Sequence, residues 1–134
     1  MHGLRLTWVW HDVDVIQLRG VVETARFRGE GEGYFGYDEG ARLAAELARF
    51  VKGSQERVAY SSGTNTSAGI HFELFTRTSA RHVYIHLKLM TQGDHEHVDG
   101  VEVTTRVAIA AVERFSRELE QLKKLGDEAF LELH

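Results

Sequence analysis

The chain has 134 residues, a formal net charge of −4 at pH 7 and no cysteine. This length suits one domain with a core of its own, and the lack of cysteine excludes disulfide bonds, thiolate metal sites and a cysteine nucleophile. Scattered basic residues argue against a nucleic-acid surface, and the lack of a long apolar run argues against a membrane protein. The N-terminus has no apolar signal region, so we expect a cytoplasmic protein.

The first third of the chain predicts three strands. Residues 4–10 alternate between large apolar and polar side chains, which is the period of a half-buried strand. Residues 13–22 form the second strand, and a slip in the phase of its apolar residues predicts a bulge there. The third covers residues 26–35. The apolar side chains expected on one face of the first strand are Leu4, Leu6, Trp8 and Trp10.

The third predicted strand contains the segment Gly29-Glu30-Gly31-Glu32-Gly33. Phosphate-binding loops are also rich in glycine, but they open a helix or carry a lysine. The two glutamates here would repel an anion. The segment is therefore interpreted as a twisted or bulged strand.

The remainder of the chain predicts two helices and further strands. Residues 39–52 have one apolar stripe, preceded by Asp38 as N-cap and followed by Gly53 as C-cap. Residues 107–125 have a second stripe. Apolar residues of the tail 130–133 are expected to pack back or to add an edge strand. The strands expected between the two helices are residues 58–60, 70–75 and 82–89 and a last strand containing Val101 and Val103.

The connections between strands have hairpin length, which requires antiparallel pairing. We therefore predict a single α+β domain over residues 1–134, with one antiparallel sheet of six to seven strands in the order βββαββββα. Two helices, each with a single apolar stripe, would pack on one face of that sheet. The other face would stay open to solvent.

That open face is the candidate binding site, because it gathers polar and aromatic side chains on two predicted neighbouring strands. Imidazoles and a carboxylate on adjacent strands stand close enough to share a zinc ion, or to act as a general base with its orienting acid. The alternative is an ordinary solvated sheet face. The residues of this face are His71, Glu73, Phe75, His82, Tyr84 and His86.

A second set of histidines lies in the polar turn of residues 93–100, where His95 and His97 could converge. A solvated hairpin turn is the alternative. No catalytic residue is expected, since no nucleophile motif is present. Trp8, Trp10, Tyr34, Phe35 and Tyr37 are interpreted as core or rim packing. The metal ligands considered for zinc are His71, His86, His95 and His97.

Several further patterns lie between residue 13 and residue 125. They are Phe27-Arg28-Gly29, Tyr34-Phe35, the acidic start and leucine stripe of residues 38–50, the strand of residues 81–87 and the Phe-x-x-x-Leu-x-x-Leu helix of residues 115–122. Together these patterns resemble the WapI-type immunity proteins and related small bacterial families. The chain departs from the pattern at Thr104-Thr105-Arg106, where an acidic residue is expected, and in the histidine turn.

The resemblance implies a non-enzymatic protein that neutralises a partner toxin by binding it. The sequence thus leaves three hypotheses: a binding protein with an immunity role, a metal-binding module or metal-dependent enzyme, and a homodimer. The homodimer would bury Phe75, Tyr84 and Met90 against a second copy.

Overall fold

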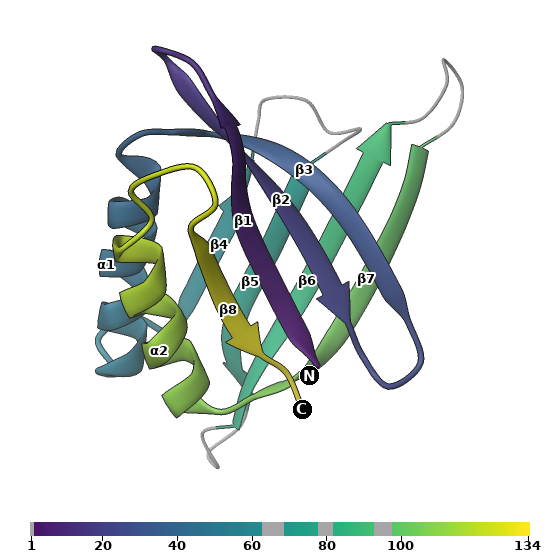
Figure 1. Ribbon diagram of the computed structural model, residues 1–134. Coiled ribbons are helices and arrows are strands. Elements are labelled where there is room, and N and C mark those ends of the chain that lie inside the picture. The colour runs from purple at the N-terminus through teal and green to yellow at the C-terminus, as the bar shows by residue number, and fades with distance from the viewer. Residues whose placement is uncertain (1, 63–68, 78–81, 93–97) are drawn as a thin grey trace.

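The computed structural model describes residues 2–62, 69–77, 82–92 and 98–134. Its helices and strands confirm the α+β class (Figure 1). In chain order they are β1 (Gly3–His11), β2 (Val15–Glu23), β3 (Arg28–Gly36), α1 (Glu39–Val51), β4 (Arg57–Ser61), β5 (Gly69–Arg77), β6 (His82–Gln92), β7 (Val98–Val107), α2 (Ile109–Glu120) and β8 (Glu128–Glu132). None of the helices within these ranges is long and apolar enough to cross a lipid bilayer.

The strands form two antiparallel sheets, so the prediction of one sheet of six to seven strands was wrong. Sheet A has the order β3-β2-β1-β8 and sheet B the order β4-β5-β6-β7. Helix α1 lies between β3 and β4 in the chain, and there the chain leaves sheet A and enters sheet B. Each sheet has one apolar face, and the two faces bury each other, as in other two-layer folds.

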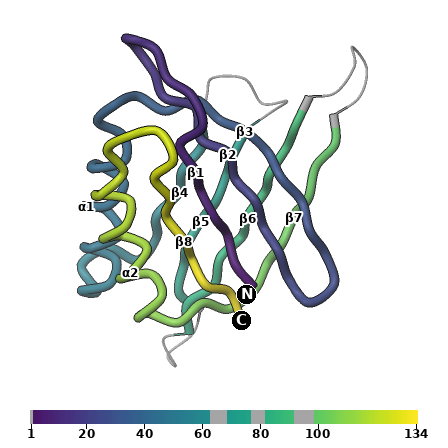
Figure 2. The backbone as a smooth tube through the Cα atoms, in the orientation of Figure 1, coloured from purple at the N-terminus to yellow at the C-terminus, as the bar shows by residue number. Residues whose placement is uncertain are grey.

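The core fills the space between the inner faces of the two sheets and the helices. Leu4 and Leu6 of sheet A and Ile85 and Leu87 of sheet B are fully buried. The helices lie side by side along one flank of the sandwich, where α1 contacts β4 and α2 contacts β8 (Figures 1 and 2). They were expected on a face of the sheet; instead they cover the open side between the two sheets.

β3 runs diagonally across the inner face of sheet B, from β7 to the side of the helices, and its glycines allow the close approach (Figure 1). A Cβ atom on Gly29 would lie 2.3 Å from Val101 Cγ1, and one on Gly33 would lie 2.2 Å from Ser62 Oγ. At Gly31 the nearest atoms belong to the backbone of Met90, at 3.1 Å. The glycine-rich segment is thus a strand, and its function is to bring the two sheets together.

The bulge lies in β1 rather than in the second strand. Trp8 is opposite Leu18 and Trp10 is opposite Gln17, so Val9 has no partner in the register. This extra residue reverses the alternation. Trp8 stays in the core, whereas Trp10 turns to the outer face, which corrects the prediction that both share one face.

The ends of the elements follow their caps and partners. Gly53 has a φ of 84°, the left-handed conformation expected of a C-cap glycine. Asp38 precedes α1 but makes no side-chain capping bond. Helix α2 begins later than predicted because β7 continues to Val107, whose side chain is buried. The tail forms the edge strand β8, which pairs with β1.

Candidate functional site

The predicted site residues lie together on the outer face of sheet B. Glu73 on β5 is opposite His86 on β6, and Phe75 is opposite Tyr84. His71 is opposite Lys88 rather than another histidine. All of these side chains point away from sheet A, because their strand neighbours form the core.

Several of the charged and imidazole groups of this face are engaged in pairs. Arg57 Nη2 lies 2.8 Å from Glu73 Oε2, and His86 Nε2 lies 2.9 Å from Glu102 Oε2. Arg106 Nη2 lies 2.6 Å from His82 Nδ1.

These pairs bear on the metal hypothesis. Across the described ranges, no three His, Asp or Glu side chains come together in a group that could hold a metal ion. Of the four histidines considered as ligands, His71 and His86 are on the face, and His95 and His97 lie outside the described residues. Zinc binding therefore gains no support from the geometry of the outer face.

An aromatic pair occupies the centre of one row of the face. The rings of Phe75 and Tyr84 are stacked, with centroids 5.9 Å apart and an interplanar angle of 19°. The register places Arg57 beside Phe75 and Arg106 beside Tyr84. Aromatic residues and arginine are the types enriched where proteins contact partners.

His71 is the one described residue with a buried side-chain polar atom, Nε2, that has no hydrogen-bond partner. Burial lowers the pKa of its imidazole below the ordinary value, and the positive charge of Lys88 lowers it further. The neutral form is therefore favoured in the folded protein.

This shift predicts a loss of stability in mild acid. A histidine in the unfolded chain binds a proton at about pH 6.5. Below that pH the unfolded state takes up more protons at this position than the folded state does, so the free energy of unfolding falls as pH falls towards the lower folded pKa. His71→Asn removes the group and should flatten this dependence in urea unfolding between about pH 7 and about pH 5. If the free energy of unfolding depends on pH equally in the wild type and the variant, the lowered pKa of His71 is contradicted.

A second surface, which the sequence analysis treated only as packing, lies on the outer face of sheet A. The bulge places Trp10 in the same row as Gln17 and Tyr34. The rings of Trp10 and Tyr34 meet edge to face, 6.4 Å apart, and are 45% and 53% exposed. We call this pair the aromatic corner.

Trp10 is the next-to-last residue of β1, so the aromatic corner lies at the base of the β1–β2 hairpin, which projects from the sheet in Figure 1. Val13 in the hairpin turn is 92% exposed, and Tyr37 donates a hydrogen bond to the carbonyl oxygen of Asp12. Beside the corner, the Gln17 amide donates to Glu32. No alternation rule reveals this surface, because the bulge that exposes Trp10 does not follow from the apolar pattern.

The outer faces of the two sheets differ in charge. The outer face of sheet B carries the basic residues Arg57, Lys88 and Arg106 and the acidic residues Glu73 and Glu102. On sheet A acidic side chains are in the majority. Its acidic residues are Glu23, Glu30, Glu32, Glu128 and Glu132, and its basic residues are Arg5, Arg19 and Arg28.

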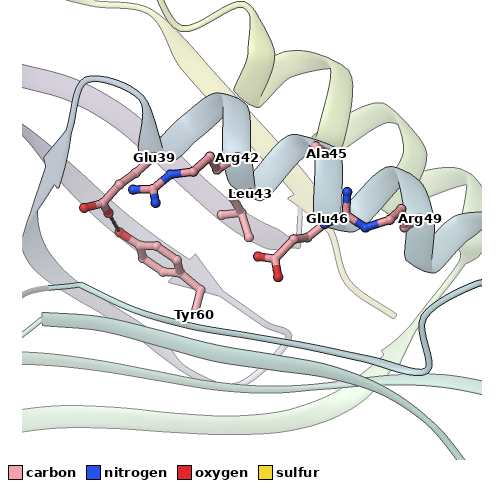
Figure 3. Close-up of a pocket in the computed structure, with 7 residues that line it drawn as sticks. All are labelled: Glu39, Arg42, Leu43, Ala45, Glu46, Arg49 and Tyr60. Atoms are coloured by element: carbon pink, nitrogen blue, oxygen red, sulfur yellow. Dashed lines mark hydrogen bonds between the residues drawn. The ribbon is translucent and has the colours of Figure 1, made fainter.

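A groove of about 460 Å³ runs beside α1 (Figure 3). Tyr60 on β4 donates a hydrogen bond of 2.6 Å to Glu39 Oε2 at the start of the helix. Burial and this carboxylate raise the pKa of the Tyr60 hydroxyl, so it stays protonated. Arg42, Glu46 and Arg49 also line the groove. The Tyr60–Glu39 bond joins α1 to sheet B, which is a structural role.

In the comparisons with known proteins, no protein-family model, no curated protein and no solved structure matches the chain. The resemblance to WapI-type immunity proteins is not tested by these comparisons and stays a prediction.

Proposed function

We propose that the protein is a non-catalytic binding protein and that the aromatic corner is the centre of its contact with a partner protein. The observation that carries this proposal is the β1 bulge, which moves a tryptophan out of the core and onto the surface. Bulges that redirect a side chain are typical of functional positions.

The composition of the aromatic corner supports this role. Tryptophan and tyrosine dominate the binding energy of protein interfaces, because each buries a large area and has few rotatable bonds. Trp10 and Tyr34 stand side by side on the outer face of sheet A, with Val13 exposed at the adjacent turn. A partner that covers this corner would remove all three side chains from water.

Charge indicates the kind of partner. Glu32 lies next to the aromatic corner, and acidic residues outnumber basic ones on the outer face of sheet A. A basic partner surface would be drawn to this face by complementary potential. The resemblance to immunity proteins implies that the partner is a toxin, and we expect its gene beside that of this chain.

The test is the binding of the purified chain to the product of a toxin gene encoded next to it, measured by isothermal titration calorimetry. Trp10→Ala should cost at least about 2 kcal/mol of binding energy, which corresponds to about a 30-fold higher Kd. The reason is that alanine removes the largest exposed apolar side chain of the corner.

Phe27→Ala is the matched control. Phe27 is also an exposed aromatic residue, 66% accessible, but it lies in the β2–β3 turn at the other end of sheet A. This variant should bind like the wild type. Tyr84→Ala tests the histidine-bearing face of sheet B in the same assay. If Tyr84→Ala raises the Kd and Trp10→Ala does not, the contact with the partner lies on sheet B and not at the aromatic corner. If the wild-type chain forms no complex with the toxin, the immunity role is refuted.

A further inference from the structure

Strand β7 presents an open edge of sheet B. It is the last strand of that sheet and pairs with β6 from Val107 opposite Val83 to Val98 opposite Gln92. Along an antiparallel strand, successive residues point their N–H and C=O groups alternately towards the neighbouring strand and away from it. The carbonyl oxygen of Arg106 accepts a bond of 3.2 Å from the His134 N–H, so it points away from β6. The backbone groups of Glu102 and Thr104 point the same way.

The short edge strands β4 and β8 are protected, whereas among the described residues the edge of β7 is bonded by the tail residue His134 at its Arg106 end. β4 and β8 have five residues each and lie beside the helices. On β8, the backbone N–H of Phe130 donates to Glu118 Oε1 at 2.8 Å. β7 has ten residues and no proline. Among the described residues, His134 provides the one backbone bond recorded on the outward side of β7. A long edge of this kind is a template for another strand.

The side chains of β7 indicate which strand would fit. Glu102 and Arg106 lie two positions on either side of Thr104, on the same outer face. If β7 pairs with β7 of a second copy about a two-fold axis at Thr104, each Glu102 stands opposite the Arg106 of the other copy. An axis at residue 102 would set the glutamates against each other, and axes at 103 or 105 would leave the charges without opposite partners.

We propose that two copies of the chain associate through their β7 edges, antiparallel, with Thr104 opposite Thr104. Sheet B then becomes one continuous sheet through both copies, with a closed two-fold symmetry. On its inner side, the half-buried Val101 and Val103 gain Val107 and Thr105 of the other copy as cross-strand neighbours. This arrangement differs from a dimer that buries Phe75 and Tyr84, because it leaves the outer face open.

Existing contacts hold the two charged side chains over sheet B. Glu102 Oε2 lies 2.9 Å from His86 Nε2 and Arg106 Nη2 lies 2.6 Å from His82 Nδ1, and both histidines are on β6. Each charged side chain therefore turns from β6 towards the edge when the cross-strand ion pair forms. The tail residue His134, whose N–H binds the Arg106 carbonyl oxygen and whose carbonyl oxygen accepts from Thr105, has to move aside for the second strand to pair at Arg106.

Disulfide trapping tests the register directly, since the chain has no cysteine of its own. In a hydrogen-bonded antiparallel pair, opposite Cα atoms are about 5.5 Å apart, which a disulfide bond can span. Thr104→Cys should form a covalent dimer under mild oxidation. Ser54→Cys, an exposed position in the turn after α1, is the control and should stay monomeric under the same conditions.

Charge reversal is a second, independent experiment. Light scattering measures the mass of each variant in solution, and circular dichroism checks that it is folded. Glu102→Arg and Arg106→Glu should each raise the dimer dissociation constant about tenfold or more, because each sets like charges opposite one another. The double variant restores opposite charges and should recover the wild-type value. A monomeric wild type at millimolar concentration, or equal cross-linking of both cysteine variants, overturns the proposal. Trp10→Ala should leave the dimer intact, which separates this result from the partner-binding test.

Discussion

Phe115→Ala should lower the free energy of unfolding by about 3–5 kcal/mol, as large-to-small changes of core aromatic residues do. Phe115 lies on α2 and is 0% exposed. Its ring meets that of Phe72 on β5 edge to face, with centroids 6.3 Å apart. Removal of the ring opens a cavity at the point where the helix packs against the sheet. Small domains have a total stability of about 5–15 kcal/mol, so the variant should be close to unfolding.

Urea unfolding followed by circular dichroism measures this loss. Ile109→Ala is the matched control, because Ile109 is the first residue of the same helix and its side chain is exposed. The control should change the stability by less than about 0.5 kcal/mol. Similar losses in the two variants would mean that α2 does not pack as described.

Gly33→Ala should be nearly as damaging, with an expected loss of about 2–4 kcal/mol. The new methyl group would lie 2.2 Å from the Ser62 hydroxyl oxygen and 2.6 Å from Ser62 Cβ, so β3 or the segment directly after β4 has to move. Ser62 is buried, and its hydroxyl accepts a hydrogen bond of 2.8 Å from the Ile70 N–H. A shift of Ser62 would therefore leave a buried backbone donor without its partner.

The same substitution at Gly40 is expected to have the opposite sign. Gly40 is in the first turn of α1, where an added Cβ would meet only the Leu119 carbonyl oxygen, at an ordinary contact distance of 3.4 Å. Alanine favours the helix, so Gly40→Ala should stabilise the protein by about 0.5 kcal/mol. Thermal denaturation of the two variants side by side distinguishes a steric effect at the sheet contact from a general effect of losing glycine.

The elements of this fold could be predicted from local patterns, but their assembly could not. The leucine stripe of residues 39–52 and the alternation of residues 82–89 each describe one apolar face, and both elements formed as expected. An alternating strand records that one face is buried, but not whether a helix or another sheet covers it. The close packing of the two sheets depends on the glycines of β3, whose role appears only when Gly29 and Gly33 are seen against Val101 and Ser62.

The candidate site shows the same limit. The outward direction of Glu73 and His86 follows from the period of two, and the structure places them opposite each other. Their other partners come from strands distant in the sequence: Arg57 binds Glu73, and Glu102 binds His86. The exposed position of Trp10 was predicted wrongly, because one extra residue in a strand reverses every later side chain.

The pairing of β1 with β8 has a consequence for the order of folding. Leu4 is opposite Leu131 and Leu6 is opposite Ala129, so the second partner of β1 is supplied by residues near the end of the chain. During synthesis, β2 and β3 are available early, whereas this side of β1 must wait until β8 has left the ribosome. Contacts between such distant segments form slowly, since the loop between them must first be closed. Completion of sheet A is therefore expected to be a late step, and a chain stalled before β8 would expose the edge of β1 to its neighbours.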